Sequence, residues 1–392
     1  MFEQADRIIV NALIFAPMGG HPSVPPISPH PQNPSIGDAC KPSLPCPSNA
    51  QGLRMDFSRR VKNDLVLAAG ILAALIPLNA HAETNTITLA RQYGIAFIPF
   101  LEMEQNHLIE KHAHLLGLPS LTVNWTVLSG AAPMNDALLS GSLSFGAGAA
   151  PSLILLWDRT HDTRNPVRGI SAVSVMPNVL VTRNPNIRTI ADYTGRDRIA
   201  LPSAKLSNAA IVLEIAAAKR WGQANYAKLD PLTVSMGHPD AVAEVLGNGE
   251  ITSHFASPPY DELELHDPRV HTVLSSVDVM GDTTLTDVWA TTSFVHDNPT
   301  VTHAVFDAIL DAIGTINQDK SAAADLYLQL SHDKIAKADL MNVLNNPHIR
   351  YNNVPLGTMA FATFMHQVGT LKSQPGDWKD LFFPIAQTLP GN

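Results

Sequence analysis

A short unit that occurs twice restricts the fold of this chain more than any other feature. The first copy runs from Leu128 to Pro151 and the second from Ser235 to Pro259. Each copy has a loop with small residues or glycine, a short amphipathic helix, a glycine that ends the helix, a short β-type run and a loop containing proline. Each copy also follows a run rich in β-forming residues, at 121–128 and 232–236. The pattern predicts two strand–loop–helix–strand units with parallel strands, and therefore two α/β lobes of similar build.

The rest of the chain also alternates between strand and helix patterns. We expect further strands at 86–91, 179–182 and 198–201, and a mostly helical chain after about Asp282. Ser207 or Asn208 is expected to cap one helix, because its side chain can accept a hydrogen bond from the first helical turn. The helices are predicted at 98–116, 209–221, from near 300, 321–330 and 357–369.

The first 82 residues differ in composition from the rest. Residues 1–54 contain ten of the 30 prolines and both cysteines, and show no periodicity. After Met55 come three basic residues, an apolar run at 65–78 and the sequence Asn-Ala-His-Ala, which ends at Ala82. This layout predicts a secretory signal peptide over 55–82, cleaved after Ala82, and hence a periplasmic protein. Residues 1–54 are then an over-called start, with Met55 as the true initiator, or a disordered extension. The alternative to a signal peptide is a genuine disordered extension, after which the apolar run forms a buried helix.

Cleavage after Ala82 would leave an acidic chain without cysteine. Residues 83–392 carry 20 basic and 30 acidic residues, a net charge of -10. The absence of cysteine excludes disulfides and thiolate chemistry from this part of the chain. The acidic balance argues against binding to nucleic acid. We expect a monomer without stable membrane insertion.

Loops that follow predicted strands supply the candidate ligand site. In open α/β sheets, ligands bind beyond the carboxyl ends of strands, and small residues let backbone N–H groups approach them. Lys205 could pair with an anion, or lie on the surface; His238 and His254 could contact a ligand, or simply pack. The candidate ligand-binding residues are Gln92, Tyr93, Gly94, Ser129, Gly130, Gly146, Ala147, Gly148, Ser203, Lys205, Ser207, Asn208, His238, Ser257 and Pro258.

The sequence does not favour an enzyme or a metal site. No serine lies in a Gly-x-Ser-x-Gly nucleophile elbow, and Gly-x-Gly occurs without dinucleotide spacing. His107, Glu110 and His114 fall on one helix face, but this spacing is more typical of a polar helix surface than of metal ligands. We therefore predict no catalytic residues, no metal and no cofactor.

Five segments resemble periplasmic substrate-binding proteins of ABC importers, in the nitrate/sulfonate/taurine branch that is grouped with thiamine-pyrimidine-precursor binders. The resemblance spans about Ile87 to the C-terminus. It implies a type II two-lobed fold, with a ligand cleft between lobes that are joined by crossover strands near Val173–Asn178 and Gly281–Ala290. Lobe I would comprise 83–175 and 281–392, and lobe II 176–280. The segments are Leu-Ile-Glu-Lys-His-Ala at 108–113, Met-Asn-Asp-Ala-Leu-Leu-Ser-Gly at 134–141, Leu-Trp-Asp-Arg-Thr at 156–160, Asp-Pro-Leu-Thr-Val-Ser-Met at 230–236 and Asp-Pro-Arg-Val-His at 267–271.

The resemblance also implies a function. It implies capture of a small sulfonate-, nitrate- or taurine-like solute by hinge closure, and delivery to a permease with a cytoplasmic ATPase. Gln92 and Tyr93 match the first ligand loop of the family, residues 129–130 the second, 146–148 the third, and 203–208 the loop of the facing lobe. Ser144 and Thr252 stand where the family often has an acidic residue, so the chain departs from the pattern there. The alternatives are a periplasmic sensor acting on a membrane partner, or a binder of a pyrimidine precursor.

Overall fold

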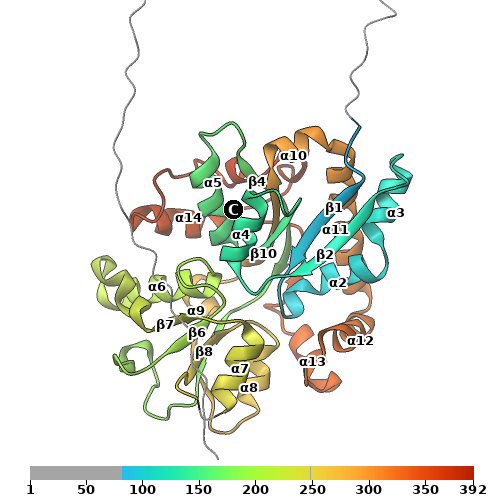
Figure 1. Ribbon diagram of the computed structural model, residues 1–392. Helices are drawn as coiled ribbons and strands as arrows, with labels where there is room; N and C mark the ends of the chain where they lie inside the picture. The colour runs from blue at the N-terminus through green and yellow to red at the C-terminus, as the bar shows by residue number, and fades with distance from the viewer. Residues whose placement is uncertain (1–81, 248) are drawn as a thin grey trace, which may run out of the picture. The chain divides into compact units, whose positions relative to one another are not determined.

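A computed structural model describes residues 82–247 and 249–392 (Figure 1). The predicted extension over 1–54 lies outside these residues, as does the predicted signal peptide apart from Ala82. The described chain forms two lobes, each built on its own mixed sheet. The predicted two-lobed α/β fold is confirmed.

The sheet of the first lobe begins with two parallel strands, β1 (Thr86–Arg91) and β2 (Thr122–Val127). A parallel bridge between Leu89 and Phe145 connects β1 to the start of β3 (Gly146–Gly148). The antiparallel strands β10 (Thr284–Thr291), β4 (Val167–Val175) and β11 (Arg350–Tyr351) continue the sheet, which gives the order β2-β1-β3-β10-β4-β11.

The sheet of the second lobe repeats this arrangement. Its order is β7-β6-β8-β5-β9, with β6 parallel to both of its neighbours and β5 antiparallel to both of its own. The strands are β5 (Val179–Thr182), β6 (Ile199–Leu201), β7 (Thr233–Ser235), β8 (Ser253–Ala256) and β9 (His271–Ser275).

The repeated sequence unit occupies the same place in both sheets. In the first lobe it forms β2, helix α4 (Ala131–Leu139) and β3, and in the second β7, helix α7 (His238–Leu246) and β8. Each pair of strands lies on either side of an earlier strand, β1 or β6, and runs parallel to it. The predicted strand–loop–helix–strand units are therefore confirmed.

The chain passes between the sheets twice. Residues 176–178 lead from β4 to β5, and residues 281–283 lead from helix α9 (Ser276–Met280) to β10. Both passages fall within the expected crossings, and the lobe boundaries at 175/176 and 280/281 stay predictions.

One predicted helix is divided in two. The pattern predicts a single helix over 98–116, but the structure has α2 (Ile98–Gln105) and α3 (Leu108–Leu115), because His107 adopts the left-handed conformation with φ 50°. The change of direction lets both short helices bury their apolar side chains in the same core. The single-helix prediction was wrong because the pattern of apolar residues continues across the break.

The remaining helices pack on the sheets or on other helices (Figure 1). Glu83 stabilises the start of α11, because its carboxylate oxygens accept hydrogen bonds from Thr300 N at 2.9 Å and Val301 N at 2.8 Å. Between 82 and 392, apart from residue 248, no helix combines the length and apolar character that a membrane span requires. The helices not yet named are α5 (Ala150–Thr160), α6 (Asn208–Trp221), α8 (Tyr260–Leu265), α10 (Thr292–Asp297), α11 (Pro299–Gln318), α12 (Lys320–Ser331), α13 (Lys337–Leu344) and α14 (Thr358–Gln367).

The lobes share part of their apolar core. One cluster belongs to the first lobe and surrounds α2, α3 and α11. A second cluster contains buried residues of both lobes, such as Leu153 and Trp289 from the first, and Leu201 and Ile211 from the second. Helix α6 of the second lobe contacts α5 and α14 of the first. The two lobes are therefore packed against each other by apolar side chains as well as connected by the crossings.

Candidate ligand-binding site

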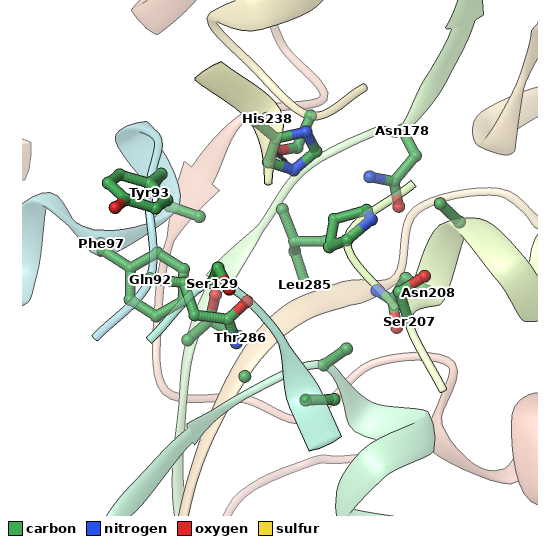
Figure 2. A pocket seen from close by; sticks show the side chains of 17 residues that line it. Gln92, Tyr93, Phe97, Ser129, Asn178, Ser207, Asn208, His238, Leu285 and Thr286 are labelled. Atoms are coloured by element: carbon green, nitrogen blue, oxygen red, sulfur yellow. Dashed lines mark hydrogen bonds between the residues drawn. The ribbon is translucent and has the colours of Figure 1, made fainter. Parts of the chain in front are cut away.

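A pocket of about 50 Å³ lies between the lobes, at the ends of strands from both sheets (Figure 2). A space of this size has room for a few water molecules. Figure 2 shows Tyr93, Phe97 and Gln92 on one side and Asn178, Ser207 and Asn208 on the other. The structure brings eight of the sequence-predicted residues to this pocket: Gln92, Tyr93, Ser129, Gly148, Ser207, Asn208, His238 and Ser257.

Four of the other predicted residues lie where the lobes touch. Ala131 N donates a hydrogen bond of 2.9 Å to Ser203 Oγ, and a Cβ added to Gly130 would lie 2.5 Å from the same oxygen. Next to Gly94, Ile95 N donates to the carbonyl of Pro258 at 3.3 Å. Gly130, Ser203, Gly94 and Pro258 therefore hold the lobes together beside the pocket instead of lining it.

The last three predicted residues have other surroundings. Gly146 makes room for Trp289, since an added Cβ would lie 2.5 Å from the indole Nε1. The carbonyl of Ala147 accepts a hydrogen bond from Gln92. Lys205 is exposed, with φ 65°, and does not line the pocket. An ion pair between Lys205 and a ligand in this pocket is not supported by its placement.

Three residues that line the pocket near the crossings were not predicted from the sequence. Asn178 lies between β4 and β5, and Leu285 and Thr286 belong to β10; all three line the pocket. They do not fit the rule that ligands bind at loops following parallel strands, because they precede or begin antiparallel strands. The prediction of crossings near 173–178 and 281–290 was the signal that could have identified these residues.

Three side-chain amides around the pocket are oriented by backbone carbonyls. Gln92 Nε2 donates to Ala147 O at 3.2 Å, Asn178 Nδ2 to Ala256 O at 3.3 Å, and Asn208 Nδ2 to Thr284 O at 2.9 Å. Because a carbonyl can only accept, these bonds fix which end of each amide is nitrogen. Within the described ranges, no hydrogen bond reaches the oxygen of any of the three amides.

A chain of buried hydrogen bonds leads away from the pocket. Ser257 Oγ lies 2.9 Å from His238 Nε2, His238 Nδ1 lies 2.8 Å from His254 Nε2, and His254 Nδ1 lies 2.9 Å from Glu264 Oε1. We call these four residues the Ser–His–His–Glu chain. His254 and Glu264 are fully buried, and His238 is 8% exposed. The chain therefore connects a residue at the pocket to a carboxyl in the interior of the second lobe.

Burial keeps the members of this chain uncharged. It raises the pKa of Glu264 to about 9 and lowers the pKa of His254 to about 3. Burial, and then the neighbouring His254, lowers the pKa of His238 well below its usual range. Glu264 Oε2 has no partner among the described residues. Placing the proton of Glu264 on Oε1 is the favourable arrangement, because a proton on Oε2 would be a buried donor without an acceptor.

The lining of the pocket contains no permanent charge. Of the described residues that line it, none is Lys, Arg, Asp or Glu. Nor do the described ranges contain a group of three or more His, Cys, Asp or Glu side chains placed to hold a metal ion. Selection of a ligand in this pocket therefore depends on hydrogen bonds, shape and the dipoles of nearby groups.

Comparison with known proteins supports the fold. No family model matches the chain, and no curated protein matches its sequence. Among solved structures, the alkanesulfonate-binding protein SsuA from Xanthomonas axonopodis pv. citri, bound to MOPS, superposes with a TM-score of 0.59 at 17% identity, over 74% of this chain and 96% of that one. The periplasmic nitrate-binding protein NrtA from Synechocystis PCC 6803 gives 0.57 at 15% identity, over 78% of this chain and 86% of that one.

A third solved structure is similar as well. A Candida albicans gene product, described as having the generic periplasmic binding protein fold, gives a TM-score of 0.57 at 12% identity, over 76% of this chain and 96% of that one. At such identities the similarity concerns the fold alone, and the resemblance found in the sequence is confirmed at that level. The chain has the two-lobed periplasmic binding protein fold that sulfonate- and nitrate-binding proteins also have.

Proposed function

We propose that this protein is the solute-binding component of an ABC-type importer. It captures a small solute between its lobes and presents the closed form to a membrane permease with a cytoplasmic ATPase. The observation that supports this function best is the pocket itself, since it lies between the lobes and takes lining residues from both. The similarity in fold to sulfonate- and nitrate-binding proteins supports it further.

The proposed mechanism is closure of the lobes about the two crossings. A solute that contacts both lobes binds the closed form more tightly than the open form, so it shifts the equilibrium between them. Contacts between the lobes, such as the hydrogen bond from Ala131 N to Ser203 Oγ, would form in the closed state. We further propose that the protein acts as a periplasmic monomer after cleavage behind Ala82.

A screen of the chain from Glu83 to Asn392 tests this function. Thermal unfolding is measured with sulfonates, nitrate, amines, pyrimidines and aromatic acids, because a ligand that binds only the folded state raises the melting temperature. X-ray scattering with the best solute is expected to show a smaller radius of gyration than without it, and loss of the gene should abolish uptake of that solute. A screen without any stabilising solute, or a ligand that produces no compaction, would contradict the proposal.

A further inference from the structure

The three side-chain amides at the pocket offer a ligand more hydrogen-bond acceptors than donors. The amides of Gln92, Asn178 and Asn208 each use one N–H for a backbone carbonyl. Each amide keeps an oxygen with two lone pairs and only one N–H. Asn208 is 2% exposed and its Oδ1 is buried without a partner among the described residues, where an unpaired polar atom is costly. A ligand that donates hydrogen bonds removes this cost.

Some of the donors that an oxyanion would need are occupied. Anions in proteins commonly bind at helix N-termini, where backbone N–H groups are free. Here Ala131 N at the start of α4 donates to Ser203 Oγ, and Ala210 N in the first turn of α6 donates to Ser207 Oγ at 3.2 Å. In α7 the second residue is Pro239, which has no N–H. The starts of α4, α6 and α7 therefore each offer one backbone N–H fewer to an anion.

No cationic side chain compensates for these missing donors. None of the described lining residues is Lys or Arg. Both ring nitrogens of His238 are already in hydrogen bonds, to Ser257 and to His254. The ionisable residue that follows Thr286 in β10 is an acid, Asp287, and it is fully buried. An anion in the pocket would meet no positive charge from the lining.

The aromatic side of the pocket suits a cation or a planar nitrogen-containing group. Tyr93 and Phe97 line the pocket on the side opposite Asn178 and Asn208 (Figure 2). The face of an aromatic ring attracts a cation and stacks on planar groups, whereas it repels an anion. A planar group with N–H donors could therefore contact the rings on one side and the amide oxygens on the other.

We propose that the pocket selects a neutral or cationic solute with N–H donors, and discriminates against nitrate and simple sulfonates. This inference rests on the proposed function, because it takes the pocket to be the ligand site. It replaces the expectation of a sulfonate-, nitrate- or taurine-like solute, which came from the family resemblance alone.

Four small probes test the inference on the chain from Glu83 to Asn392. Methylguanidinium and N-methylurea donate N–H bonds, whereas methanesulfonate and nitrate only accept. Dissociation constants are measured by calorimetry or NMR titration at constant ionic strength. At least one of the two donor probes is expected to bind about tenfold more tightly than either anion. An anion that binds in this pocket as tightly as the donor probes would overturn the inference.

A pair of variants locates the effect. Gln92→Met removes an acceptor from the pocket and is expected to weaken binding of the donor probes about tenfold, with no loss for the anions. Gln223→Met is the matched control, because the amide of Gln223 also donates to a backbone carbonyl, that of Gln367, but does not line the pocket. Equal effects of both variants on the donor probes would contradict the inference.

The solute screen and the four probes together distinguish failure of this inference from failure of the proposed function. If the solute screen finds a ligand that is anionic and binds in the pocket, the proposed function stands and this inference fails. If a neutral or cationic N–H donor is found, both stand. If neither the screen nor the four probes yield a ligand, the proposed function fails and the inference falls with it.

Discussion

At the scale of single residues, the Ser–His–His–Glu chain shows how burial determines protonation. An isolated carboxyl of this type titrates near pH 4.5, but burial raises the pKa of Glu264 to about 9. The pKa values of His238 and His254 are shifted in the opposite direction, since burial lowers both, that of His254 to about 3. All three groups are neutral at pH 7, and each change of charge requires the protein to place a charge in its interior.

The variant Glu264→Gln should alter how stability depends on pH. Between the ordinary pKa of 4.5 and the folded value of about 9, the folded protein holds a proton on Glu264 that the unfolded chain has released. This group therefore makes the free energy of unfolding fall as pH rises through that window. Below about pH 6.5 the buried histidines oppose the trend, because the unfolded chain protonates them and the folded one does not.

Denaturant unfolding between pH 6.5 and 9 measures this effect. The wild-type protein should lose stability with rising pH more steeply than Glu264→Gln, by on the order of 1 kcal/mol per pH unit. Other buried acids, such as Glu214, contribute equally to both proteins and cancel in the difference. Identical slopes in the two proteins would show that Glu264 is already ionised in the folded state.

The Ser–His–His–Glu chain was only partly predictable from the sequence. Ser257 and His238 were identified because they lie in or beside loops that follow strands. Glu264 was not, because it belongs to α8 and meets His254 only when that helix packs on β8. The orientation of the amides at Gln92, Asn178 and Asn208 depends in the same way on carbonyls that only the fold brings near.

At the scale of elements, the contact between the start of α4 and the loop after β6 connects the lobes. Gly130 precedes α4, and its extended backbone, with φ 176°, is accessible to any residue. What requires glycine here is space, because an added Cβ would lie 2.5 Å from Ser203 Oγ and 2.6 Å from Pro202 O. These neighbours belong to the facing lobe, so the close approach exists only while the lobes are together.

Gly130→Ala should therefore keep the lobes apart without unfolding either one. We expect at least a tenfold loss of affinity for the solute and little or no compaction by X-ray scattering when solute is added. Gly195→Ala is the control, because nothing lies within 4 Å of its added Cβ and its backbone needs no left-handed conformation. Normal affinity and compaction in Gly130→Ala, with unchanged circular dichroism, would show that this contact does not control closure.

The elements themselves were largely predictable. The repeat identified β2–α4–β3 and β7–α7–β8, since glycine, proline and alternating apolar residues mark the ends of these elements locally. The break at His107 was not predicted, because its cause is the shape of the core that α2 and α3 share. Likewise, no local pattern shows that β10 pairs with both β3 and β4 and thereby brings Thr286 to the pocket.

At the scale of the whole molecule, the apolar cluster shared by the lobes couples their stability. Leu153 and Trp289 of the first lobe belong to the same cluster as Leu201 and Ile211 of the second. Unfolding one lobe would expose apolar surface of the other, at a cost of roughly 25 cal/mol per Å². The lobes are thus expected to unfold together, although each has its own sheet.

Differential scanning calorimetry tests this coupling. The chain from Glu83 to Asn392 should show a single transition, with a calorimetric enthalpy close to the van't Hoff enthalpy. Tryptophan fluorescence, to which the buried Trp289 contributes together with four other tryptophans, should give the same midpoint as circular dichroism gives for the backbone. Two resolved transitions would show that the shared cluster is too weak to join the lobes into one cooperative unit.

The hydrogen bonds of Glu83 make the stability of the processed protein depend on which peptide bond is cleaved. Its carboxylate accepts from the backbone of Thr300 and Val301 at the start of α11, a helix whose apolar side chains fill the core of the first lobe. Cleavage after Ala82 would retain this residue as the new N-terminus, whereas cleavage one bond later would discard it. Loss of such a cap typically costs about 1 kcal/mol. An export peptidase that cut imprecisely would therefore release a mixture of two products that differ by one residue and in stability.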